Sequence, residues 1–182
     1  LFKASRDRWH ASSAEDDRRS DSRRLISYGK LILLEHSNIP NALGSADMVA
    51  VAANVAAAGL ETWERSQDEP TARSTWRLYG HLLDVHPRNQ QFLRGRAILA
   101  ASQGETSEAI RFWRILMTGT STGSEAWFEA RTRLLENMEQ TDPAHVWNVL
   151  EQHQVLYPEW GPPPWGQRLR ALALRLGSSH QG

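Results

Sequence analysis

The sequence predicts an all-α protein of about seven or eight helices, arranged as a stack of antiparallel helix pairs. Apolar residues recur with the 3.6-residue period of a helix from the middle of the chain onward. Alternating runs of β-branched residues, which would indicate strands, do not occur. Proline, glycine and capping residues leave only short connections between the periodic stretches, so each helix is expected to fold back on the one before it.

Three amphipathic helices are expected in the second half of the chain, over 106–118, 123–139 and 143–157. Each carries an apolar stripe that must be buried against a neighbouring helix. His153 falls within the third stripe, and for the histidines in general a structural or surface role is a better account than metal binding. The stripes consist of Ala109, Ile110, Trp113, Leu116 and Met117; of Trp127, Ala130, Leu134, Leu135 and Met138; and of Val146, Val149, Leu150 and Leu156.

Capping signals place the helix ends. Asp142 followed by Pro143 is typical of an N-cap and first helical residue, because the carboxylate accepts an unpaired N–H and proline has none to donate. Asp68 precedes another expected helix in the same way. Gly104 is placed as a left-handed C-cap, and Pro158 as a stop.

The remaining segments are expected to differ in how well ordered their structure is. Helices are expected over 21–36, 45–66, 71–86 and 89–103, the second of them rich in alanine, which indicates close helix–helix approach. Residues 1–20 have no persuasive period, so we expect a loosely ordered or irregular segment there. Residues 159–177 are expected to form a Pro/Trp-rich turn and a capping helix, and 178–182 a tail. The capping stripe is Trp165, Leu169, Leu172 and Leu176.

The repeat length is informative. The spacing of Pro87 and Pro158 corresponds to roughly 35 residues for each of two helix pairs, close to the period of tetratricopeptide repeats. The chain resembles that family at Gly104 in the inter-helix turn, at the small residues Ala97 and Ala109, and at Trp113. The resemblance is best over 88–158 and implies a TPR-like α-solenoid over 21–158, in which small residues of one helix accept bulky ones of the next.

Composition and motifs argue against catalysis. The chain has 21 Lys+Arg and 21 Asp+Glu, so no net charge attracts nucleic acid or an anionic membrane. It has no cysteine and therefore no thiolate chemistry. His145 and His153 are too far apart along a helix to share an ion, and neither a G-x-S-x-G nor a phosphate-loop motif occurs. We expect no catalytic residue, no cofactor and no metal.

The family resemblance implies a concave groove that binds a protein or peptide. The expected groove residues lie on the first helix of each pair: Gln91, Arg94, Ile98, Glu125, Phe128, Arg131 and Thr132. The family's clamp for a terminal carboxylate is not matched, because Ile98 follows one turn after Arg94. The sequence therefore predicts a non-catalytic interaction scaffold with a protein partner of unspecified sequence.

Several alternatives stay open. The chain could self-associate or cap other repeats through an exposed apolar helix face, or contact nucleic acid through the arginines of its N-terminal segment. Trp160 and Trp165, beside prolines, could dock a peptide or instead pack against the C-terminal cap. Leu1 in place of methionine indicates part of a larger chain. No membrane span is expected, and the compartment is open, with the cytoplasm favoured.

Overall fold

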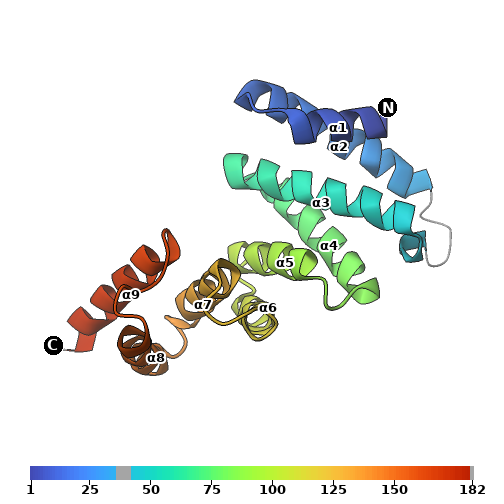
Figure 1. The fold of residues 1–182 in the computed structure, drawn as a ribbon. Helices are drawn as coiled ribbons and strands as arrows, with labels where there is room; N and C mark the ends of the chain where they lie inside the picture. Colours follow the sequence, from blue (N-terminus) through green and yellow to red (C-terminus); the bar gives the residue numbers. More distant parts are fainter. Residues whose placement is uncertain (36–41, 181–182) are drawn as a thin grey trace. The chain divides into compact units, whose positions relative to one another are not determined.

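A computed structural model describes residues 1–35 and 42–180. Within these residues it contains nine α-helices, one short 3-10 helix and no strand (Figure 1). The predicted all-α fold is confirmed. The chain forms two compact units, which begin at Leu1 and at Ala100, so that their boundary falls inside one helix. No helix in the described ranges combines the length and the apolar character that a membrane crossing needs.

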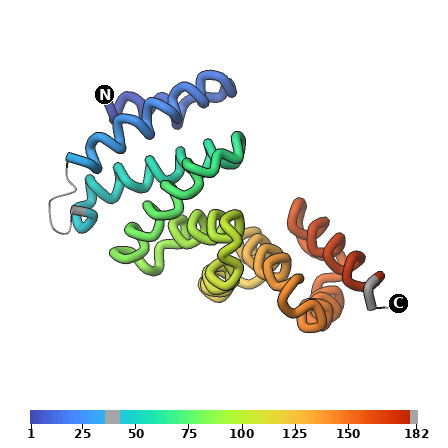
Figure 2. Tube along the Cα trace, turned by 180° about the vertical axis from the view of Figure 1, so that it is seen from behind, coloured from blue at the N-terminus to red at the C-terminus, as the bar shows by residue number. Residues whose placement is uncertain are grey.

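The first unit is built from helices that each pack on the next: α1 on α2, α2 on α3 and α3 on α4. Ser45 and Asp68 cap α3 and α4, with their side-chain oxygens accepting hydrogen bonds from the amides of Met48 (3.2 Å) and Thr71 (2.8 Å). Figure 2 shows the path of these helices. They are α1 (Phe2–Ala11), α2 (Glu15–Glu35), η1 (Ala42–Gly44), α3 (Ala46–Ser66), α4 (Glu69–Val85) and α5 (Gln90–Ser102). The last three residues of α5 belong to the second unit.

The expectation that residues 1–20 are loosely ordered is wrong. They form α1 and the start of α2, and Trp9 is buried in a cluster with Leu25 and Ala58. The indole Nε1 of Trp9 donates a hydrogen bond to Oε2 of Glu61 on α3, at 3.0 Å. Apart from Trp9 and the partly buried Phe2, α1 is held by polar contacts, and two apolar anchors give no clear apolar period in the sequence.

Small residues allow the helices of the first unit to approach closely, as the alanine-rich composition of α3 predicted. A Cβ atom at Gly59 would overlap the Thr75 side chain, and one at Gly95 would overlap the Tyr79 ring. Tyr79 is only 2% exposed, and this burial raises the pKa of its phenol above the ordinary value. Nearby, the Arg96 guanidinium lies 3.6 Å from the centre of the Trp76 ring.

The second unit contains α6 (Thr106–Thr118), α7 (Glu125–Met138), α8 (Pro143–Leu156) and α9 (Trp165–His180). Helix α7 packs on α6 and α8, and α9 packs on both α7 and α8. The predicted caps are confirmed: Asp142 accepts from the amide of His145 at 3.1 Å, and Gly104 has a φ of 77°. The core around α7, α8 and α9 contains Trp127, Phe128, Leu135, Val146, Leu150, Trp160, Trp165, Leu169, Leu172 and Leu176.

The predicted C-terminal segments need a correction. The capping stripe of α9 is buried as predicted, but the helix continues to His180. The expected tail over 178–182 is therefore helical as far as 180. Residues 36–41 of the predicted repeat segment and 181–182 of the tail lie outside the described residues.

The burial of Trp9 makes a testable prediction. We expect Trp9→Ala to lower the free energy of unfolding of the first unit by about 3–5 kcal/mol, because it leaves a cavity against α2 and α3. Chemical denaturation followed by circular dichroism measures the change. Arg19→Ala, an exposed residue on α2, is the control and should change the stability little. Equal stabilities of Trp9→Ala and the parent would show that α1 is not part of the packed unit.

Candidate functional site

The structure divides the predicted groove residues into exposed and buried ones. Gln91 and Arg94 are exposed on α5, and Glu125 is exposed at the start of α7. Ile98 is only 8% exposed and belongs to the core of its unit, so its assignment to an open groove is wrong. Its position in the repeat pattern placed it on the open face, but its neighbours in the fold cover it.

The assignment is also wrong for Phe128 and Thr132 on α7. Phe128 is 3% exposed, and Thr132 is fully buried, with its hydroxyl donating to the carbonyl oxygen of Phe128 at 2.7 Å. Helices α6, α8 and α9 all contact α7, so these side chains have no access to a partner. Arg131 is half-buried, and its Nε donates a hydrogen bond to Nδ1 of His153.

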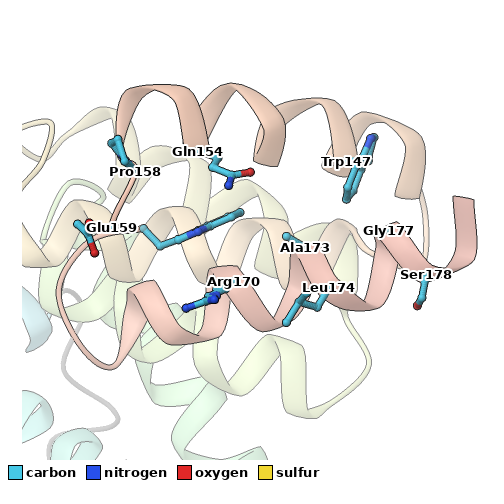
Figure 3. Close-up of a pocket in the computed structure, with 10 residues that line it drawn as sticks. Trp147, Gln154, Pro158, Glu159, Arg170, Ala173, Leu174, Gly177 and Ser178 are labelled. Atoms are coloured by element: carbon cyan, nitrogen blue, oxygen red, sulfur yellow. The ribbon is translucent and has the colours of Figure 1, made fainter. Parts of the chain in front are cut away.

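An open groove instead lies between α8 and α9 of the second unit (Figure 3). Its volume is about 670 Å³. The residues that line it come from one face of each helix and from the connection between them. They are Trp147, Gln154, Pro158, Glu159, Trp160, Arg170, Ala173, Leu174, Gly177 and Ser178.

The apolar part of the groove is formed by Trp147 of α8 and by Ala173, Leu174 and Gly177 of α9 (Figure 3). A Cβ atom at Gly177 would lie 3.1 Å from two atoms of the Trp147 ring, so the indole packs directly against the backbone of α9. Leu174 is 69% exposed. A leucine this exposed beside an aromatic ring gives a partner an apolar contact.

The groove also carries one residue of each charge. Arg170 on α9 is exposed, and no hydrogen bond or ion pair engages it within the described part of the chain. The other two arginines of α9 are each paired with an acidic residue. Arg168 bonds Glu136 at 2.9 Å, and Arg175 bonds Glu139 at 2.9 Å. Glu159 lies at the end of the groove near Pro158 (Figure 3).

A buried histidine holds the inner wall of the groove. His153 of α8 is fully buried, and its Nε2 lies 3.2 Å from the carbonyl oxygen of Trp160, which lines the groove. Its Nδ1 accepts a hydrogen bond from Nε of Arg131 at 3.1 Å. Tyr157 stacks on the imidazole with a ring-centre distance of 4.9 Å. Of the two roles expected for the histidines, structural or surface, His153 has the structural one.

These contacts fix the protonation state of His153. Because the arginine N–H can only donate, Nδ1 must be the unprotonated nitrogen, and Nε2–H donates to the Trp160 carbonyl. Burial lowers the pKa of His153 below its ordinary value, and the charge of Arg131 lowers it further. The folded protein therefore favours the neutral imidazole.

The lowered pKa predicts that stability depends on pH. The unfolded chain takes up a proton at His153 below about pH 6.5, whereas the folded unit resists it, so stability is complete above this pH and falls as the pH drops. We expect His153→Gln, whose amide does not titrate but can both accept and donate a hydrogen bond, to reduce the loss of stability between pH 7 and 5.

Denaturation at several pH values measures this loss. The exposed His145 on the same helix gives the matched control, and His145→Gln should keep the pH dependence of the parent. An unchanged pH profile in His153→Gln would contradict the assignment.

The N-terminal arginines were an alternative contact site for nucleic acid. Several of them are paired within the first unit: Arg8 and Arg24 with Asp21, at 3.4 and 3.6 Å, and Arg18 with Glu61. Arg19 and Arg23 line a separate open space with Arg65, beside Glu15 and Asp68. The mixture of charges reduces the positive field that a nucleic acid would need.

The described residues contain no group of three or more His, Asp or Glu side chains that could hold a metal ion. Comparisons of the chain with protein-family models, with curated proteins and with solved structures find no match.

The groove between α8 and α9 was not predicted from the sequence. Trp147 lies beside the stripe of Val146, Val149 and Leu150, and part of its ring packs on Gly177. Trp160 and Trp165 pack in the core, being only 8% and 9% exposed, and Trp160 also lines the groove. One signal was present: Leu174 is an apolar residue outside the stripe of Leu169, Leu172 and Leu176, so it could not point to the same core.

Proposed function

We propose that the chain is a non-catalytic protein-interaction module, and that it binds a polypeptide segment in the groove between α8 and α9. The observation that carries the proposal is the exposed Leu174 beside Trp147, in a groove of about 670 Å³ that also holds the unpaired Arg170. An apolar contact flanked by a charged group is the usual composition of a protein-binding surface. The tetratricopeptide resemblance supports the same class of function.

Self-association is the competing interpretation of the same surface. It predicts that the groove of one copy is occupied by another copy, so that the exposed leucine is buried in a dimer. Sedimentation at several concentrations distinguishes the two interpretations. We expect a monomer at all concentrations, whereas a dimer that Leu174→Gln dissolves would contradict the proposal.

The binding test uses a library of displayed random 18-residue peptides, selected on the immobilised chain 1–182. We expect enriched peptides whose affinity falls about tenfold or more in Leu174→Gln, because burying a leucine side chain contributes roughly 1.5–3 kcal/mol. Fluorescence anisotropy of labelled peptides measures the affinity.

The matched control is Val155→Gln. Val155 is 80% exposed on α8 but does not line the groove, so its substitution removes the same kind of apolar surface elsewhere on the unit. We expect the enriched peptides to bind it as they bind the parent. Failure to enrich any peptide, or equal losses in the two variants, would overturn the proposal.

A further inference from the structure

We propose that the segment that occupies the α8–α9 groove is an amphipathic α-helix with a carboxylate that contacts Arg170. This inference rests on the proposed function and specifies the class of partner. It depends on the shape of the groove, on the nature of its walls and on the state of Arg170.

The first argument is the shape of the groove. The lining residues of α9 are 170, 173, 174, 177 and 178, which recur at i, i+3, i+4, i+7 and i+8 and so form one straight face of the helix. They extend over about 12 Å, or roughly two helical turns. Trp147 and Gln154 of α8, two turns apart, form the opposite wall (Figure 3). Such a trough between two helices matches the cylinder of a third.

Small residues on α9 favour the same ligand. Ala173 and Ser178 carry short side chains, so a helix backbone can approach α9 closely beside them, whereas the space over Gly177 is taken by the Trp147 ring. Leu174 projects beside them and is 69% exposed. It can enter the space between side chains of the docked helix, as a ridge enters a groove.

The second argument is the nature of the walls. Both are α-helices, whose backbone N–H and C=O groups are bonded within the helix. An extended ligand could therefore not add a strand to them, and its own backbone groups would lose water without gaining partners. A helical ligand bonds its own backbone groups and needs only side-chain contacts.

The third argument is charge. Helix α9 contains no acidic residue, and Glu136 and Glu139 of α7 and its C-cap are occupied by Arg168 and Arg175. Arg170 remains exposed with no partner in the described ranges. A carboxylate on the ligand would complete the pair. Glu159 at the Pro158 end makes the groove unsuited to a uniformly acidic helix, so the ligand is amphipathic with mixed charge.

The experiment compares two libraries of 18-residue peptides selected on the chain 1–182. One has apolar residues fixed at i, i+3, i+4, i+7 and i+11 and all other positions random. The other has proline fixed in P-x-x-P repeats, and favours the polyproline conformation that aromatic grooves bind. We expect enrichment in the first library, an excess of Asp or Glu at one position, and a gain of helicity on binding by circular dichroism.

Arg170→Glu tests the charge. We expect the substitution to lower the affinity for the enriched peptides on the order of fivefold at low salt, and by less at high salt. Peptides in which the selected acidic residue is replaced by lysine should bind Arg170→Glu better than the original peptides do. Arg114→Glu is the matched control, because Arg114 is an exposed arginine on α6 outside the groove. It should leave binding unchanged.

The outcomes separate the two proposals. Enrichment from the proline library alone, lost in Leu174→Gln, would support the proposed function and overturn the helical ligand. Enriched helical peptides that Arg170→Glu binds as well as the parent would overturn the role of Arg170. Enrichment from neither library would overturn both.

Discussion

Burial of the leucine stripe of α9 against α7 and α8 is the contact on which the candidate site depends. Leu169 and Leu172 are fully buried, and Leu176 is 6% exposed. Each buried leucine contributes roughly 1.5–3 kcal/mol, more than a solvent-accessible ion pair such as Arg168–Glu136 or Arg175–Glu139 provides. Because this stripe holds α9 beside α8, the residues of α9 outside the stripe, such as Leu174, share a surface with Trp147 of α8.

Polar groups complete the positioning that the apolar stripe begins. The fully buried His153 bonds the Trp160 carbonyl on one side and Arg131 on the other. A buried imidazole without partners would be destabilising, so both contacts are required for it to lie within an aromatic cluster. Trp160 has a φ of 67°, which is uncommon for a residue with a side chain, and the bond from His153 helps to hold it there.

The functional residues were harder to predict than the helices. Repeat positions placed Phe128 and Thr132 on an open face of α7, although three other helices cover it. Arg131 was assigned to a partner, whereas its Nε donates to His153. Trp147 and Leu174 were not assigned to a site, because their exposure depends on how α9 packs against α8. In each case an amphipathic pattern identifies the apolar face but not the neighbour that covers it.

The sequence by itself determined the all-α class, the helices after residue 45 and the N-caps at Asp68 and Asp142. These features depend on residues within about four positions of one another, and such interactions can be read along the chain. Only the tertiary structure decided that α1 is packed and that a groove is open beside α9. Their deciding contacts join residues far apart: Trp9 bonds Glu61 across 52 positions, and Arg168 bonds Glu136 across 32. No local pattern specifies which distant helix will provide such a partner.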